Sequence, residues 1–181
     1  MRDRFVWLVL LLIIFSSLAS ASILGSKHDL RGSSSFGNPQ EVCKVCHIPH
    51  LSTAPAYLAA PGRVYAGGTL TFYGGSVGQP TNSSQVCLSC HDGTLAPSVG
   101  TTSTDYTHTH PFSVVYPTRT GYAPAVAGQI TGAYGTVKIE GTGNKRIECG
   151  TCHNPHEKGI SQNFLVIENT NSNLCLTCHQ K

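Results

Sequence analysis

Residues 41–50 read EVCKVCHIPH, with two cysteines separated by two residues and a histidine directly after the second cysteine. The pattern C-x-x-C-H recurs as CLSCH at 87–91, CGTCH at 149–153 and CLTCH at 175–179. It is the attachment sequence of c-type haem, in which two thiols bond to the porphyrin and the histidine ligates the iron. Four copies use all eight cysteines, so the sequence predicts four covalently attached haem c groups. The expected attachment residues are Cys43, Cys46, Cys87, Cys90, Cys149, Cys152, Cys175 and Cys178, and the expected proximal ligands are His47, His91, His153 and His179.

Two other uses of paired cysteines fit the pattern less well. Secreted proteins often join eight cysteines in four disulfides, and zinc ribbons also contain C-x-x-C pairs. Neither arrangement requires a histidine after every pair, whereas haem attachment does. The sequence therefore favours haem over disulfides and over zinc.

The N-terminus has the pattern of a secretion signal. Arg2 and Arg4 precede an apolar run at 5–15, and the small residues ASA at 19–21 form an A-x-A cleavage site. The run is shorter than the roughly 20 apolar residues that a membrane-spanning helix needs. We therefore expect residues 1–21 to be removed, the chain to be exported, and the mature chain to have no transmembrane segment.

The mature chain has little protein for each cofactor. The 181 residues less the 21 of the signal leave about 40 residues per haem, too few for an ordinary aliphatic core. Charged residues make up 12% of the chain, which contains 19 glycines and 10 prolines. We expect a mostly irregular, loop-rich multihaem cytochrome c, with a few short helices and short strands wrapped around a stacked haem array. Short strands are expected at 69–73, 113–117 and 136–140, and a short helical turn at each motif.

The motifs form an internal repeat. The stretches 42–50 and 148–156 share C-x-x-C-H-x-P-H, and the stretches 86–91 and 174–179 share C-L-x-C-H, in the same order. The repeat predicts one tetrahaem domain, 22–181, made of two dihaem modules at about 22–91 and 92–181.

The sixth ligand of each iron separates electron carriers from enzymes, since an open iron can bind a substrate. The only methionine is Met1, which leaves with the signal, so histidine is the expected sixth ligand. Nine histidines leave five beyond the proximal four, enough to close every iron. A proline neighbours His110, as it does His50 and His156, which favours His110 over His108. The expected distal ligands are His28, His50, His110 and His156.

Chain geometry limits which haem each distal histidine can reach. His50 and His156 each follow a proximal histidine by three residues, and that span is too short to go round a porphyrin about 10 Å across. Each is therefore expected to ligate a neighbouring haem. His50 is expected to ligate the haem of the second motif, and His156 the haem of the fourth motif. The first and third haems would then take His28 and one of His108 and His110, in an order left open.

Several stretches resemble a known group of proteins: KHDL at 27–30, CHIPH, CHNPH, THPF at 109–112 and the terminal CLTCHQK. They are similar to secreted multihaem c-type cytochromes with doubled C-x-x-C-H motifs, and within these to tetrahaem extracellular cytochromes that polymerise into nanowires. The resemblance implies bis-histidine haems and a homopolymer built through head-to-tail contacts, with one axial histidine shared between subunits. His28, on a Gly/Ser-rich arm, is the candidate for the shared ligand.

The expected function is electron transfer rather than catalysis. The finer expectation is a subunit of an extracellular conductive filament that carries electrons to an external acceptor at the cell surface. The alternative is a monomeric periplasmic tetrahaem electron carrier. A net charge of +3 without a basic patch gives no indication of nucleic-acid binding, and the redox donor and acceptor are not indicated. Asn82 begins a glycosylation sequon, a triplet common by chance.

Overall fold

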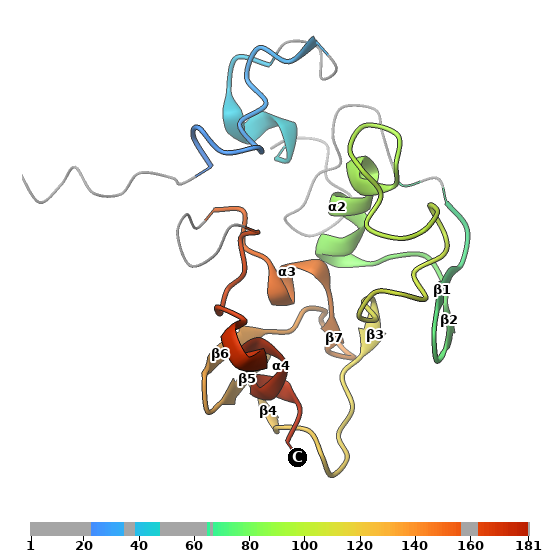
Figure 1. The fold of residues 1–181 in the computed structure, drawn as a ribbon, viewed down its shortest axis with the longest axis vertical. Helices are drawn as coiled ribbons and strands as arrows, with labels where there is room; N and C mark the ends of the chain where they lie inside the picture. The colour runs from blue at the N-terminus through green and yellow to red at the C-terminus, as the bar shows by residue number, and fades with distance from the viewer. Residues whose placement is uncertain (1–22, 35–38, 48–64, 66, 157–162, 181) are drawn as a thin grey trace, which may run out of the picture.

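The structure is a computed structural model that describes residues 23–34, 39–47, 65, 67–156 and 163–180. The expected signal segment and His50 lie outside these residues. Loops and turns make up most of the chain (Figure 1), which confirms the expected loop-rich fold. The helical elements are all short: the 3-10 helices η2 (Val42–Val45) and η3 (Thr170–Ser172), and the α-helices α2 (Asn82–His91), α3 (Cys149–Cys152) and α4 (Asn173–Cys178).

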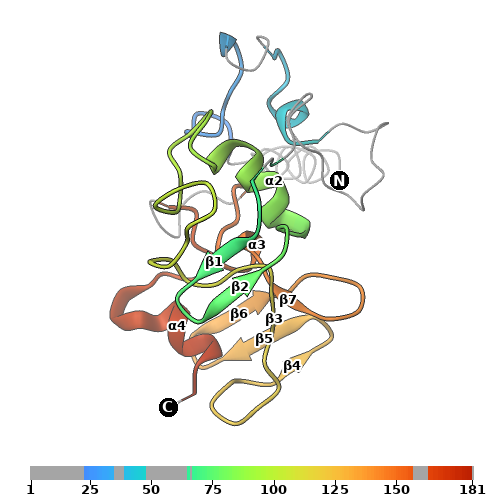
Figure 2. The ribbon, with the colours of Figure 1, turned by 90° about the vertical axis from the view of Figure 1, so that its right-hand side faces the viewer.

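Each C-x-x-C-H motif forms a helical turn, as expected. The backbone N–H of His47 donates to the carbonyl of Cys43 at 2.8 Å, and the equivalent bond closes the third and fourth motifs at 2.9 Å in both. The second motif ends α2. Because residues three and four apart share one face of a helical turn, the thioether and iron ligands of a motif can reach one cofactor. Figures 1 and 2 show the motif segments in chain order down the long axis, from the cyan segment through α2 and α3 to α4.

The strands form three small antiparallel sheets in the described part of the chain. The three expected strands are confirmed as β1, β3 and β6, each shorter than its predicted range. The sheets are β1 (Leu70–Phe72) with β2 (Gly75–Val77), β3 (Val114–Val115) with β7 (Arg146–Ile147), and the meander of β4 (Ala125–Val126), β5 (Gln129–Gly132) and β6 (Gly135–Lys138).

The meander supports the fourth motif. Ala127 and Gly128 join β4 to β5 with φ of 50° and 78°, the positive values that a type I′ hairpin turn requires. At the other end of β5, a Cβ on Gly132 would collide with the backbone of Thr177. Glycine at this position therefore lets α4 lie directly against the sheet.

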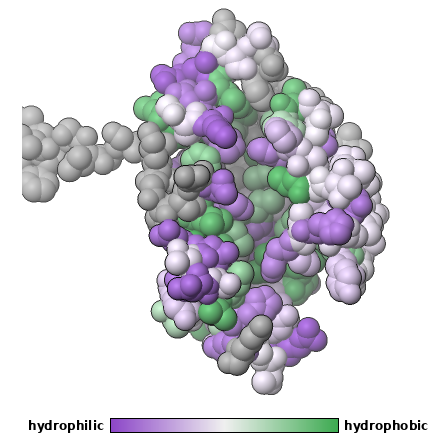
Figure 3. Space-filling view, in the orientation of Figure 1, coloured by the Kyte–Doolittle hydropathy of each residue, from purple (hydrophilic) through white to green (hydrophobic). Residues whose placement is uncertain are grey.

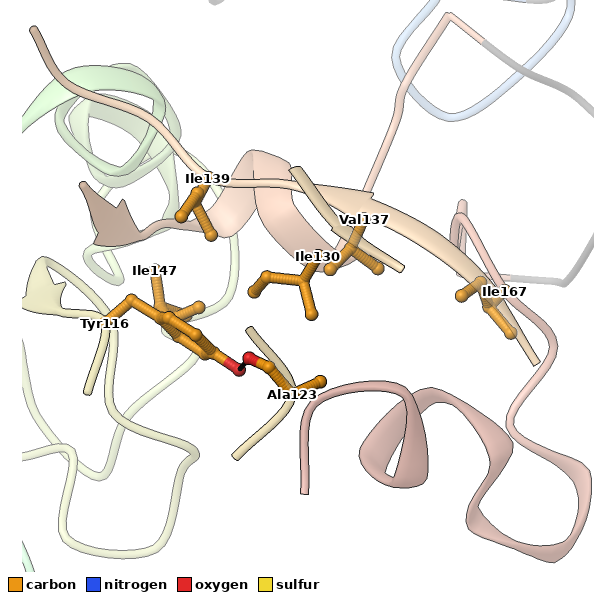
Figure 4. Close-up of a cluster of buried hydrophobic side chains, with 7 residues drawn as sticks. All are labelled: Tyr116, Ala123, Ile130, Val137, Ile139, Ile147 and Ile167. Atoms are coloured by element: carbon orange, nitrogen blue, oxygen red, sulfur yellow. Dashed lines mark hydrogen bonds between the residues drawn. The ribbon is translucent and has the colours of Figure 1, made fainter. Parts of the chain in front are cut away.

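A first hydrophobic cluster lies over the meander (Figure 4). Ile130 and Val137 face each other across β5 and β6 and are fully or almost fully buried. Leu174 and Cys178 of α4 pack against the cluster, so it also fixes the helix that carries the fourth motif. Its members are Tyr116, Ala123, Ile130, Val137, Ile139, Ile147 and Ile167.

A second, mainly aromatic cluster holds the second motif. The ring of Phe112 lies 5.1 Å from the rings of both Phe72 and Tyr106, edge to face. Leu88 of α2 is completely buried among these rings, and Cys149 packs at the margin of the cluster. The members are Tyr65, Leu70, Phe72, Leu88, Tyr106 and Phe112.

A buried polar network joins the second and third motifs. The carboxylate of Glu148, 1% exposed, accepts hydrogen bonds from Thr81 Oγ1 at 2.5 Å, Asn82 Nδ2 at 3.2 Å and Ser113 Oγ at 2.8 Å. The start of α3 is bonded to α2 as well, because the N–H of Cys149 donates to Ser84 Oγ at 2.9 Å. The sequon at Asn82 therefore takes part in packing, and Ser84 is fully buried.

Candidate haem-binding sites

No disulfide joins any of the eight cysteines, which all fall within the described residues at exposed or half-buried positions. Burial raises the pKa of Cys46, and the nearby Cys90 adds to the shift. Burial likewise raises the pKa of Cys152 to about 12, with Cys178 adding to it. The members of each of these pairs come from different motifs, so the first motif lies beside the second and the third beside the fourth.

The helices of the second and third motifs lie against each other. The electrostatic interaction between the thiols of Cys87 and Cys149 raises the pKa of Cys87 and lowers that of Cys149. The N–H of Cys149 also donates to Ser84 Oγ of α2, and the polar network of Glu148 binds the same two helices.

Four histidine rings have their Nδ1 atom satisfied by an oxygen. Nδ1 of His91, His110 and His153 lies 3.3, 2.8 and 2.8 Å from a backbone carbonyl oxygen, and Nδ1 of His156 lies 3.2 Å from Asn154 Oδ1. A carbonyl oxygen only accepts, so Nδ1 carries the proton and Nε2 keeps its lone pair. Metal-ligating histidines have this arrangement, in which a second hydrogen bond fixes the ring and the tautomer.

Three proximal histidines each face one other histidine ring. The ring centroids of His47 and His156 are 5.8 Å apart, with planes at 31°. Those of His91 and His28 are 6.0 Å apart at 65°, and those of His179 and His110 are 6.2 Å apart at 74°. The three separations are nearly equal although the partners come from unrelated loops.

These separations fit two imidazoles on opposite sides of one iron. A metal–imidazole bond measures about 2 Å, and a ring centroid lies roughly 1 Å behind its nitrogen, which gives a centroid separation of about 6 Å. Each ring can turn about its own bond to the metal, so any angle between the planes is compatible. The residues present therefore fit haem iron with histidine on both faces.

His28 is the most enclosed of the three distal candidates that the structure describes, since His110 and His156 are exposed. Its Nδ1 atom is buried without a hydrogen-bond partner in the described part of the chain. Burial, with a smaller contribution from the charge of His91, lowers the pKa of His28, which favours the neutral imidazole that ligates metals. Phe164 lies 5.1 Å from the same ring and covers it.

The histidine pairs differ from those expected from chain order. His156 was expected at the fourth motif but faces His47 of the first, and His110 occupies the position beside His179. His28 faces the second motif, which had been expected to take His50. Chain spacing excluded His50 and His156 from the haem of the motif that each one follows. It did not identify the haem that each would ligate, because this depends on how distant loops pack.

The remaining histidines have no such partner in the described part of the chain. His108 is exposed and contributes only a weak lowering of the pKa of Asp105, after the larger effect of hydrogen bonds from Thr107. His153 is bonded through Nδ1 but faces no second histidine ring among the described residues. His50 lies outside them.

The surface agrees with a cofactor-lined interior. Figure 3 shows one face of the molecule hollowed along its middle, with hydrophobic residues in the hollow and hydrophilic residues around it. Within the described ranges, no three His, Cys, Asp or Glu side chains gather as ligands of a metal ion, which a tetrahedral zinc site would require. No helix among those residues is long and apolar enough to cross a bilayer.

Comparison with known proteins supports the same class. Residues 143–181, which hold the third and fourth motifs, match the family model described as the doubled CXXCH motif. A search of curated proteins gave no match. The doubled motif, the eight cysteines and the loop-rich fold are those of a multihaem c-type cytochrome, whose cysteines allow up to four haems.

Proposed function

We propose that the chain binds four haem c groups, each closed by two axial histidines, and carries electrons without transforming a substrate. The observation that carries this proposal is the set of three histidine pairs with ring centroids 5.8–6.2 Å apart, each containing the histidine of a C-x-x-C-H motif. A second histidine on the iron leaves no position for a substrate, as an enzyme would need.

The haem would supply a one-electron iron couple, at a lower potential than histidine–methionine ligation gives. The protein supplies attachment, orientation and insulation. The motif turns place the thiols and the proximal ring on one side, where they would hold the haem, and the carbonyl bonds to Nδ1 leave Nε2 of His91 and His153 as the nitrogen that would bind the iron. The two hydrophobic clusters fix the helices that carry the second and fourth motifs.

At a finer level, we propose an exported subunit that polymerises head to tail into an extracellular filament with a shared axial histidine. Low charge density, 12% of residues, suits close contact between copies. Tyr73 and Val126, on two hairpins, are 93% and 71% exposed and offer apolar surface for such contact.

One observation favours the second candidate, a monomeric periplasmic carrier. His28, the expected shared ligand, lies 6.0 Å from His91 of its own chain. A chain whose distal ligands all come from itself needs no partner to close its irons. A filament would then depend on surface contacts, or on a different histidine such as the exposed His108.

Two measurements test the proposal: spectroscopy of the purified holoprotein tests electron transfer through closed haems, and electron microscopy of cell-surface material tests the filament. In a potentiometric titration followed by visible spectroscopy, we expect four electrons per chain, low-spin haem throughout and little binding of carbon monoxide. Rapid, complete binding of carbon monoxide to one reduced haem would favour an enzyme instead. Electron microscopy of material sheared from the cell surface separates filaments from the discrete monomers of a periplasmic carrier.

A further inference from the structure

We propose that His156 is the sixth ligand of the iron attached to the first motif, on the face opposite His47. The inference rests on the proposed haem function and specifies a ligand that crosses from the second half of the chain to the first. The two ring centroids are 5.8 Å apart, within the distance that two imidazoles on one iron require.

The other motifs do not compete for His156. The haem of its own motif is excluded, since the chain from His153 to His156, three residues further on, is too short to pass round a porphyrin. The fourth motif faces His110 at 6.2 Å, and the second motif faces His28 at 6.0 Å. His47 is therefore the proximal ring left for His156 in the described structure.

The local structure of His156 suits a ligand role. Asn154 Oδ1 accepts hydrogen bonds from the backbone N–H of His156 at 3.1 Å and from its Nδ1 at 3.2 Å. These two bonds fix the backbone and the ring together and leave Nε2 with its lone pair. His156 is itself exposed in the protein chain, so its ring is accessible to a cofactor.

The proposed ligation has a structural consequence. His153 is the proximal ligand of the third haem, and His156 follows it by three residues, so one short segment holds the first and third haems side by side. The N-terminal arm adds a similar link, because His28 packs against Phe164. The two dihaem modules are therefore joined by ligands and cannot close their irons separately.

The first test replaces His156 in the full-length holoprotein. In His156→Ala, we expect one haem of four to become five-coordinate and high-spin in the ferric absorption and magnetic circular dichroism spectra. Added imidazole should restore the low-spin spectrum, which a purely structural loss would not allow. The control is Glu168→Ala, an exposed side chain that is not a candidate iron ligand, and its spectrum should be unchanged.

A second step identifies the affected haem. Cys43→Ala with Cys46→Ala removes the first haem, and adding His156→Ala to that chain should produce no further high-spin haem. In a chain that lacks the fourth haem through Cys175→Ala and Cys178→Ala, His156→Ala should still produce one. A high-spin haem in the first background, or none in the otherwise native chain, would overturn the assignment.

The native holoprotein provides a test that does not depend on variants. A cryo-electron microscopy or crystal structure should place Nε2 of His156 about 2 Å from the iron of the haem attached to Cys43 and Cys46. A bond from His156 to any other iron, or to none, contradicts the inference. Absence of covalent haem would instead defeat the proposed function, so the two failures are distinguishable.

Discussion

The mature chain made without haem attachment is expected to be largely unfolded. Its two hydrophobic clusters contain seven and six buried residues, and they lie apart over different sheets. Folding a residue costs about 1–2 kcal/mol of backbone entropy, which such small clusters do not offset without the cofactors that fill the interior. The described part of the chain has three sheets with strands of two to four residues, and helices of at most ten residues. Elements this short add little stability of their own.

The experiment compares residues 22–181 produced in a reducing cytoplasm with the same chain matured with haem. Far-UV circular dichroism and hydrogen exchange should show a disordered apoprotein and a protected holoprotein. The only tryptophan, Trp7, lies in the expected signal, so fluorescence of that residue cannot report folding of the mature chain. A compact apoprotein with a cooperative unfolding transition would show that the protein core suffices by itself.

Glu148→Ala is expected to destabilise the holoprotein by roughly 3–5 kcal/mol. The carboxylate is 1% exposed and accepts from Thr81, Asn82 and Ser113. Its removal leaves these three donors unpaired in a buried site, at a cost of about 1–3 kcal/mol for each donor that water cannot reach. The network also joins α2 to α3, so the second and third motifs should loosen together.

Urea denaturation followed by far-UV circular dichroism measures this loss, since covalent haem stays attached in the unfolded chain. Glu148→Gln keeps one acceptor oxygen and should lose less than Glu148→Ala. The matched control is Glu168→Ala at an exposed position, where a change within about 0.5 kcal/mol is expected. Equal stability of the Glu148 and Glu168 variants would mean that the network contributes nothing to the fold.

The sequence predicted the parts of the fold that local chemistry determines. A thioether-bonded cofactor requires two cysteines and a histidine on one face of a turn, so each motif had to form a helical turn. β-prone stretches predicted β1, β3 and β6. For β1 and β6 the pairing is local, because each belongs to a hairpin, whereas β3 pairs with the distant β7. The absence of one large core followed from the small number of residues available per haem.

The parts that the sequence did not predict depend on contacts between distant residues. Glu148 stands directly before Cys149 and gave no signal of its role in joining the motifs, because its donors on Thr81, Asn82 and Ser113 lie 35 or more residues away. The pairing of His156 with His47 joins residues from opposite ends of the chain. Spacing could exclude a histidine from its own haem, but only packing identified the motif that it faces.

We expect a covalent haem at every C-x-x-C-H motif. Intact mass spectrometry of the denatured, reduced mature protein can count these haems, because only covalently bound haem survives denaturation. We expect one species whose mass equals residues 22–181 plus four haems, with no free thiol left to alkylate. A mass equal to the bare chain, or a chain with eight alkylated cysteines, would contradict this expectation.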